Sequence, residues 1–391
     1  MPEDRGRGDQ MTRTRVLHLS ASFPRTVDDS VAPFLLDLVR LEQAAGFEVA
    51  VVAAHDEGLP RRQVLDGVAV RRARYGPGRC EVLAYRGGGH ASLRSPWHAA
   101  LLPPLAASMA TSLVAEVRRF RPDVVHAHWL LPSGLLAALL PRSRRPTVVV
   151  HLHGNDVVLA AGRAGPLARL VARRVDAVGA VSEQLAREGE RVLRLAPGTI
   201  TVARLPLPAA PPPTPLPAAP LRALAAGRAS KEKGFDVLLE AMALPAAAAW
   251  SLTMVTDGPQ RGFLEAQAAR LGLGGRVRFD PPCARHELHA LVARHHAVVV
   301  PSRSEGLGLF ALEALALGRP VVASRVGGLT EVVVDGDDGR LVPPDDPQAL
   351  AEALGGLVVR PPVARAVERH REGPVLDAIS RLYGLATAAI R

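Results

Sequence analysis

The chain has 391 residues, of which 48% are hydrophobic and 22% charged, a composition typical of a globular protein that buries sizeable cores. This excludes a largely disordered chain, which would be poorer in apolar residues. The excess of 48 basic over 38 acidic residues is moderate, so we expect no nucleic-acid partner. The two cysteines, Cys80 and Cys283, exclude a disulfide framework and favour a reducing compartment.

The N-terminal segment, residues 1–12, is charged and has no apolar core. It predicts a disordered extension rather than a signal peptide, and we expect a cytoplasmic protein. The longest uncharged stretch, residues 99–115, contains Pro103 and Pro104. Because a membrane-spanning helix needs about 20 apolar residues, this stretch predicts a buried or interfacial helix. Any membrane contact is expected to be peripheral.

Short apolar runs alternate with amphipathic stretches over residues 13–204, which is typical of parallel βαβ units. The near-continuous Val and Leu content of these runs indicates a sheet that is covered on both faces. We expect strands at 15–20, 47–54, 123–129, 147–153 and 177–182, with helices between them, for example at 34–46 and 167–175.

Residues 205–220 contain eight prolines and predict a semi-rigid extended linker, because proline lacks the amide donor and restricts the residue before it. The alternation then repeats over residues 221–370. Residues 371–391 predict a C-terminal helix that packs back across the domains. The pattern therefore indicates an α/β protein with two Rossmann-like, doubly wound domains that face a central cleft. Strands of the second domain are expected at 221–227, 251–258, 276–280, 297–302 and 320–326.

The most informative motif is PSRSEGLGLFALEALALG at 301–318, where a strand ends, a turn follows and a helix begins near Leu309. The N-terminus of a helix presents unpaired amides and the positive end of the helix dipole, which together bind phosphate. Glu305 in the turn and Glu313 in the helix are placed to accept hydrogen bonds from hydroxyls beside a diphosphate. The alternative is that Glu305 caps the helix and Glu313 is a surface charge.

Two basic residues, Arg228 and Lys233, follow the first strand of the second domain. The loop after that strand opens at the carboxyl edge of the sheet, where ligands bind. A guanidinium and an ammonium group at this edge can neutralise a diphosphate. The alternative is an ordinary solvated run of charges together with Lys231 and Glu232.

The segment HLHGND at 151–156 places His153 where the chain turns at the edge of the first sheet. We expect His151 to face the other side of its strand. A single histidine at a sheet edge is usually structural. The pairs His151/His153 and His126/His128 are weak indications of a metal site, and we expect no metal ion.

The second domain resembles the retaining GT-B glycosyltransferases, specifically the large family four. The resemblance runs from about residue 224 to 354, and the first domain matches it more loosely. It rests on these motifs: G-R-x4-K-G (227–234), D-G-P (257–259), P-S-x2-E-G-x-G-L-x3-E-A (301–314), G-x-P-V-V-A-S (318–324), G-G-L-T-E (327–331), D-G-x2-G-x-L-V-P-P (335–344), D-V-V-H-A-H-W (123–129), H-G-N-D (153–156) and A-V-S-E-Q-L (180–185).

This resemblance implies transfer of a sugar, with retention of configuration, from a nucleotide-diphosphate donor to a hydroxyl of a glycan, lipid or small metabolite. The donor is expected to be a UDP-sugar, or else a GDP-sugar, and no cofactor or metal is expected. Glu305 would contact the transferred sugar, Glu313 would bind the ribose, and residues 280–285 would neighbour the base. The resemblance implies catalytic roles for Arg228, Lys233, Glu305 and His153, and donor binding by Arg228, Lys233, Gly306, Gly308, Leu309 and Glu313.

The sequence departs from the family pattern at three places: the loop after the first strand, Thr256 in place of the first glycine of G-D-G-P, and VARLPLP at 202–208 before the linker. The glycine-rich loop that often follows the first strand is replaced by SFPRTVDDSVAPF at 22–34. This change leaves open whether the first loop contacts the donor. Two alternative functions also remain, a nucleotide-sugar epimerase and a catalytically weak, nucleotide-sugar-binding partner subunit.

Overall fold

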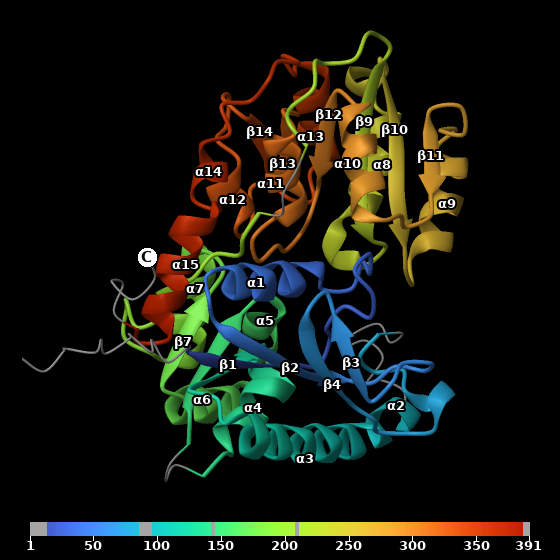
Figure 1. Ribbon diagram of the computed structural model, residues 1–391. Helices are drawn as coiled ribbons and strands as arrows, with labels where there is room; N and C mark the ends of the chain where they lie inside the picture. The colour runs from blue at the N-terminus through green and yellow to red at the C-terminus, as the bar shows by residue number, and fades with distance from the viewer. Residues whose placement is uncertain (1–13, 86–95, 142–144, 208–210, 386–391) are drawn as a thin grey trace, which may run out of the picture.

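The computed structural model describes residues 14–85, 96–141, 145–207 and 211–385. In these ranges the chain forms two lobes, each a mainly parallel sheet with helices packed on it (Figure 1). The expected disordered extension at residues 1–12 lies outside the described residues. The last residues of the chain, 386–391, do so too.

The first lobe is built on a sheet of eight strands in the order β3-β4-β2-β1-β5-β6-β7-β8. Neighbouring strands in it are parallel, except for the antiparallel pair β3 and β4. Its central strands are buried along almost their whole length, as their Val-rich runs predict. The strands are β1 (Arg15–Ser20), β2 (Glu48–Ala54), β3 (Arg62–Leu65), β4 (Val68–Ala73), β5 (Val124–His128), β6 (Thr147–Leu152), β7 (Ala177–Ala180) and β8 (Thr201–Val202).

The apolar runs predict neither the β3–β4 hairpin nor the two-residue edge strand β8 of this sheet. The turn residues of the hairpin, Asp66 and Gly67, have φ angles of 51° and 80°, which a two-residue hairpin turn requires. An Asp-Gly pair is itself a hairpin signal, so the turn is encoded locally. The place of the hairpin at the sheet edge depends on the parallel pairing of β4 with β2.

The longest helix of the first lobe, α3, packs Leu105, Met109 and Leu113 against the sheet. The segment Trp97–Phe120, which contains α3, is long and apolar enough to cross a membrane by length and composition, with a mean hydropathy of 1.4. Only 28% of its most apolar window is buried, so α3 covers the sheet with one face and exposes the other. The helices are α1 (Pro33–Ala44), α2 (Pro96–Ala100), α3 (Leu102–Phe120), α4 (Leu135–Ala138), α5 (Asn155–Ala161), α6 (Gly165–Arg174) and α7 (Glu183–Leu193).

The second lobe is built on a parallel sheet of six strands in the order β11-β10-β9-β12-β13-β14. Its strands are β9 (Leu221–Arg228), β10 (Trp250–Asp257), β11 (Val277–Asp280), β12 (Ala297–Val300), β13 (Val321–Ser324) and β14 (Gly339–Val342). Its helices are α8 (Phe235–Ala243), α9 (Arg261–Arg270), α10 (Arg285–Ala293), α11 (Leu309–Ala316), α12 (Leu329–Val332), α13 (Pro347–Gly355) and α14 (Arg365–Glu368).

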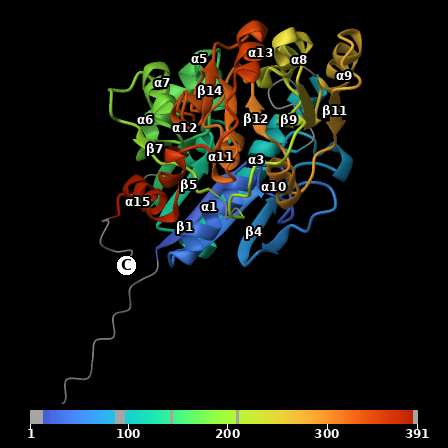
Figure 2. The same ribbon diagram turned by 90° about the horizontal axis from the view of Figure 1, so that it is seen from above.

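The last described helix, α15 (Glu372–Leu382), returns to the first lobe. Both views place it beside β7 (Figures 1 and 2), and it also contacts β8 and α1. It buries Val375, Ile379 and Leu382, and Tyr383 follows directly after it. The C-terminal part of the chain therefore contributes to the core of the N-terminal lobe.

The Pro-rich segment forms neither helix nor strand in its described residues, 205–207 and 211–220. It is tied at both ends to the second half of the chain. The Nδ1 atom of His370 lies 2.8 Å from the Leu205 carbonyl oxygen, and the Leu207 amide donates to the His370 carbonyl at 3.0 Å. Further along, Arg319 donates to Thr214. Since its described residues are anchored in this way, this segment is not a free tether.

The buried histidine of this anchor makes stability depend on pH. Burial lowers the pKa of His370 to about 4, whereas an unfolded chain binds the same proton near pH 6.5. The unfolded state thus binds more protons between these values, and the free energy of unfolding decreases as the pH falls from 6.5 toward 4. Between pH 7 and pH 5 this one group accounts for about 2 kcal/mol.

We expect His370→Gln to lose less stability than the wild-type protein between pH 7 and pH 5, by about that amount. Urea unfolding at the two pH values measures the difference. The control is His286→Gln, which removes an exposed histidine. Equal pH dependence in the two variants would show that the His370 proton is not linked to folding.

Candidate active site

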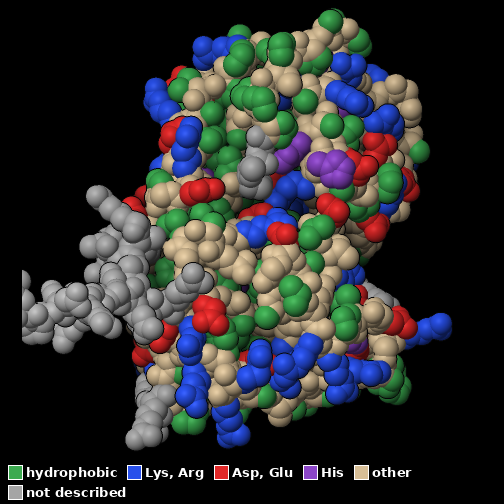
Figure 3. Space-filling view, in the orientation of Figure 1, with side chains coloured by type: hydrophobic (Ala, Val, Ile, Leu, Met, Phe, Trp, Pro, Cys, Tyr) green, Lys and Arg blue, Asp and Glu red, His purple; other side chains and the backbone are tan. Residues whose placement is uncertain are grey.

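The two lobes enclose a cleft of about 1460 Å³. In each sheet the chain connections reverse direction beside a central strand, because β1 lies between β2 and β5, and β9 lies between β10 and β12. Ligands of doubly wound sheets bind outside the carboxyl ends of the strands at such points. Figure 3 shows basic, acidic and histidine side chains where the two lobes meet. The cleft therefore has the position and the polarity of a binding site for a charged ligand.

Arg228 and Lys233 lie on the second-lobe side of this region. Arg228 is the last residue of β9 and lines the cleft, and Lys233 ends the turn that follows. The Lys233 ammonium donates to the Glu305 carboxylate at 2.7 Å, and the Ser302 hydroxyl approaches the same oxygen at 3.2 Å. Helix α11 is capped at Gly308 without a side-chain hydrogen bond. Glu305 therefore pairs with Lys233 and does not cap the helix.

Glu313 lies in the first turns of α11 and is only 6% exposed, which excludes an ordinary surface charge. One of its carboxylate oxygens is 3.4 Å from Arg285, and the other is 3.5 Å from His289. Arg285 also donates to Asp37 of α1 at 2.6 Å. Burial raises the pKa of Asp37, and the charge of Arg285 opposes that effect. These four residues line the cleft and connect its two walls.

The loop that contains Glu305 touches the first lobe through its backbone. A Cβ atom at Gly306 would overlap the carbonyl oxygen of His153, and one at Gly154 would lie 3.1 Å from the Gly306 Cα atom. Gly154 has a φ of 124°, which side chains rarely allow. The Ser182 hydroxyl donates to the Gly306 carbonyl at 2.8 Å. Glycine at both positions therefore lets the lobes meet here.

A second contact between the lobes lies near this loop, at the N-terminus of α7. The Glu331 carboxylate accepts hydrogen bonds from the backbone amides of Glu183 and Gln184, at 3.1 and 2.7 Å. Negative charge at the N-terminus of a helix is stabilised by unpaired amides and by the helix dipole. A side chain of the second lobe thus caps a helix of the first lobe.

His153 follows β6 at the point of closest approach between the lobes. Its ring lies against Phe34, which lines the cleft, and against Trp129. Burial holds the pKa of His153 well below its usual value, so the imidazole is neutral. The next turn is fixed by buried Asp156, which accepts the backbone amides of His153 and Leu130 at 2.7 Å each. Burial raises the pKa of Asp156 to about 6.

The expectation that His151 faces away from His153 is wrong. The two ring centroids are 4.9 Å apart, because residues two apart on a strand share a face. His18, His126 and His128, from the neighbouring strands β1 and β5, join them. The ligand atoms of two groups of three, His18/His126/His128 and His128/His151/His153, lie within 4.8 Å of one another. Strand pairing brings together five histidines that lie in the sequence as two pairs and one single residue.

The loop after the first strand also reaches the cleft, through residues 27–31. Arg25 holds it, because its guanidinium donates to Asp29 at 2.7 and 3.0 Å and to Asp56 at 3.0 Å. The second-lobe residues that resemblance places near the base are represented in the cleft by Pro282, Cys283 and Arg285. Both segments therefore contribute to the walls.

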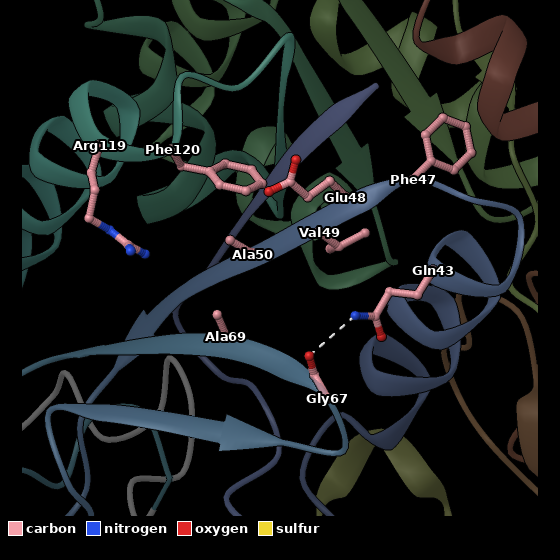
Figure 4. A pocket seen from close by; sticks show the side chains of 9 residues that line it. All are labelled: Gln43, Phe47, Glu48, Val49, Ala50, Gly67, Ala69, Arg119 and Phe120. Carbon is pink, nitrogen blue, oxygen red and sulfur yellow. Dashed lines mark hydrogen bonds between the residues drawn. The ribbon is translucent and has the colours of Figure 1, made fainter. Parts of the chain in front are cut away.

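A second hollow, of about 430 Å³, lies on the first lobe between β2, β4 and the ends of α1 and α3 (Figure 4). A hydrogen bond from the Gln43 side-chain amide to the Gly67 carbonyl, 3.5 Å long, crosses it. None of its described lining residues lines the cleft or is a candidate site residue. We therefore place the functional site in the cleft.

Comparison with models of protein families shows which family this chain belongs to. Residues 220–359 match the model for glycosyl transferases group 1, and residues 31–206 match the model for glycosyltransferase family 4. The chain belongs to glycosyltransferase family 4. It is a GT-B enzyme of the glycosyltransferase class, as the motifs of its second half predict.

Among curated proteins, D-inositol 3-phosphate glycosyltransferase 1 of Catenulispora acidiphila is 33% identical over 68% of this chain and 72% of its own length. The glycogen synthase of Mycobacterium tuberculosis is 29% identical over 96% of this chain and 94% of its own length.

Among solved structures, sucrose-phosphate synthase of Thermosynechococcus elongatus superposes with a TM-score of 0.72 at 24% identity, covering 97% of this chain and 96% of its own. The Anabaena protein HepE, in complex with UDP and glucose, has a TM-score of 0.65 at 18% identity, covering 94% and 99%. At these identities the structures show a shared fold.

Of the predicted site residues, Arg228, Leu309 and Glu313 line the cleft, and Glu305 and Gly306 line a smaller hollow of about 320 Å³ beside Gly154. Lys233 pairs with Glu305, Gly308 caps α11, and the His153 ring lies against Phe34 of the cleft wall. Asp37 was not predicted as a site residue, whereas its partner Arg285 ends the segment that the resemblance places near the base. Asp37 is one acidic residue in an amphipathic helix, and nothing in its neighbourhood in the sequence marks it. Its partner comes from a position 248 residues away, so only the folded chain brings them together.

The contact at Gly306 can be tested by adding a single methyl group. We expect Gly306→Ala to push the loop away from the His153 carbonyl and separate the lobes. The variant should show a larger radius of gyration in small-angle scattering. Gly274→Ala is the control, since a Cβ atom there meets nothing within 4 Å. An unchanged scattering profile in Gly306→Ala would contradict a closed cleft that depends on this contact.

Proposed function

We propose that this enzyme transfers a sugar from a nucleotide-diphosphate donor to a hydroxyl group of a glycan, lipid or small-metabolite acceptor. The observation that carries the proposal is the grouping of Arg228, Lys233, Glu305 and the N-terminus of α11 at the carboxyl edge of the second sheet. Such a set of groups suits a diphosphate with a sugar attached. The UDP and glucose bound by HepE support a UDP-sugar as donor, with a GDP-sugar as the alternative.

The proposed reaction breaks the bond between the anomeric carbon and the diphosphate oxygen. The acceptor hydroxyl oxygen forms the new bond to that carbon, and its proton passes to the leaving diphosphate. Negative charge builds up on the diphosphate in the transition state, and fixed positive groups aimed at it lower the barrier. Arg228, Lys233 and the first amides of α11 would supply that charge, so we propose that no metal ion or cofactor is needed.

The acceptor would attack from the face that the diphosphate leaves, which retains the configuration of the sugar. Glu305 would contact the sugar while Lys233 and Ser302 hold its carboxylate in place. Glu313 would accept the ribose hydroxyls from a buried position beside Arg285. Nuclear magnetic resonance of the anomeric proton in the product distinguishes retention from inversion.

Removing the cationic pair should abolish most of the activity. We expect Arg228→Ala and Lys233→Ala each to lower the transfer rate by roughly 10²–10³, because each loses about 2–4 kcal/mol of charge stabilisation in the transition state. Release of nucleoside diphosphate in the presence of an acceptor panel measures the rate. Lys231→Ala is the matched control, because it removes an exposed lysine from the same turn.

Near-wild-type turnover of the double Arg228/Lys233 variant would refute this assignment. A chelator should leave the rate unchanged, and a rate restored by added Mg²⁺ or Mn²⁺ would refute the metal-free reaction. The same samples distinguish the alternatives. An epimerase would convert the donor sugar without releasing nucleotide, and a partner subunit would bind donor without turnover.

Glu313 and Glu305 should have different roles, in nucleotide binding and in sugar transfer. We expect Glu313→Ala to weaken binding of the free nucleoside diphosphate about tenfold or more, since it loses hydrogen bonds to the ribose. Glu305→Ala should bind the nucleotide as the wild type does and lose sugar transfer. Calorimetry with the nucleotide alone measures the first effect. Equal losses of nucleotide affinity in both variants would contradict the division.

A further inference from the structure

A chain of hydrogen bonds runs from His153, whose ring lies against Phe34 of the cleft wall, into the core of the first lobe. His153 Nε2 lies 3.1 Å from His128 Nδ1, and His128 Nε2 lies 2.9 Å from His18 Nδ1. His18 Nε2 then lies 2.6 Å from Glu42 Oε2. His128, His18 and Glu42 are at most 1% exposed, so water does not compete for these contacts.

The chain continues on the other side of Glu42. Its Oε1 atom lies 2.6 Å from the Tyr383 hydroxyl, which lies 2.7 Å from His126 Nδ1. His126 Nε2 lies 3.2 Å from His151 Nδ1, and His151 Nε2 lies 2.8 Å from the Ala203 carbonyl oxygen. Seven contacts thus join His153 to a backbone carbonyl that can only accept.

This order of contacts restricts where the hydrogens are. Each of the five histidines and Tyr383 supplies one hydrogen when neutral. The Tyr383 hydroxyl donates to Glu42 Oε1, and the other carboxylate oxygen, Oε2, accepts from His18 Nε2. A neutral His18 that donates from Nε2 accepts at Nδ1, so His128 donates from Nε2 and accepts at its own Nδ1 from His153 Nε2. The acceptor at Glu42 therefore gives His153 the Nε2–H tautomer.

Burial keeps four of these histidines in the neutral form. It holds the pKa values of His126, His128 and His153 well below their usual range, and it lowers the pKa of His151 to about 4. A buried polar network is stable when each of its members is satisfied. Among the described residues, both ring nitrogens of His18, His126, His128 and His151 have partners, whereas the buried Nδ1 of His153 has none.

We propose that Glu42, His18 and His128 are positioning residues that hold His153 as the Nε2–H tautomer, so that its Nδ1 atom can only accept a hydrogen bond. That the donor to Nδ1 is a hydroxyl of the bound substrate rests on the proposed function. With the opposite tautomer His153 would present a donor, which would suit a phosphate oxygen. The network therefore selects a hydroxyl over a phosphate at this position.

The alternative is that the same histidines form a metal-binding site. In such a site three nitrogen lone pairs point at one ion. Here the nitrogens are engaged pairwise, and their remaining positions are taken by Glu42, Tyr383 and the Ala203 carbonyl. The hydrogen-bonded chain thus accounts for their arrangement, and a bound metal is an outcome that the experiment separates.

Nitrogen-15 resonance on the full-length, histidine-labelled protein tests the tautomer directly. The long-range proton–nitrogen spectrum shows which ring nitrogen carries hydrogen, and His153→Gln assigns the His153 signals. We expect hydrogen on Nε2 and none on Nδ1 in the ligand-free enzyme. Hydrogen on Nδ1 would overturn the proposal. Ring-nitrogen shifts that appear on adding one equivalent of Zn²⁺ and vanish with a chelator would replace it with a metal site.

Variants at Glu42 test whether this residue sets the tautomer of His153. Glu42→Gln should keep the wild-type spectrum, because its amide oxygen accepts from His18 and its NH₂ group donates to Tyr383. Glu42→Leu removes both contacts and should yield a mixture of His153 tautomers. Tyr383→Phe, the control, cuts the chain on the far side of Glu42 and should retain the Nε2–H form. A pure Nε2–H tautomer in Glu42→Leu would overturn the role of Glu42.

The spectrum is measured without substrate, so it remains decisive even if the proposed transfer reaction is wrong. For the reaction, we expect Glu42→Leu to lower kcat about tenfold, the value of one hydrogen bond near 1.4 kcal/mol. Its nucleotide affinity should not change, and Glu42→Gln should restore kcat. A loss of nucleotide affinity equal to the loss of kcat would indicate general damage to the fold and refute a positioning role.

Discussion

The backbone contact between Gly306 and the His153–Gly154 turn sets the distance between the two lobes at the site. On one side of it lies the loop that carries Glu305, and on the other lies the end of β6. Because both positions are glycine, the two backbones approach more closely than any side chain would allow. The hydrogen bond from Ser182 and the cap that Glu331 provides for α7 hold the same arrangement. His153 and Glu305 are neighbours only while these contacts persist.

Ion pairs hold the charged side chains in and beside the cleft. Lys233 donates to Glu305, and Arg285 lies between Asp37 and Glu313, so these three carboxylates each have a basic partner within 3.4 Å. Partly buried charges need such partners, because burial without them would favour the neutral form. These pairs fix the orientation of the carboxylates. A ligand with hydroxyl and phosphate groups can exchange partners with them without exposing an unpaired charge.

The first lobe differs from the second in the composition of its interior. The sheet of the first lobe carries a row of histidines among its Val and Ala residues, joined through Glu42 on α1 and through Tyr383 after α15. Apolar side chains would fill the same space with less polar desolvation. What the polar row adds is direction, because in the proposed tautomer the hydrogen bonds from His153 through His128 and His18 all run toward Glu42. It also makes the C-terminal return of the chain part of the environment of His153.

Much about this protein is determined locally. Val-rich runs and amphipathic stretches predicted the inner strands of both sheets, since burial on two faces requires continuous apolar strands, but not β8 or β14 at the edges. The 301–314 motif predicted the turn and the helix that begins at Leu309. The Asp66–Gly67 turn was also present in the sequence, but the hairpin's short strands gave no apolar run. The pairing of Asp37 with Arg285, the Gly306 contact and the histidine chain were decided by tertiary structure alone. Each joins residues far apart in the sequence, such as Glu42 and Tyr383, which are 341 positions apart, and strand pairing and domain packing place them within hydrogen-bond distance.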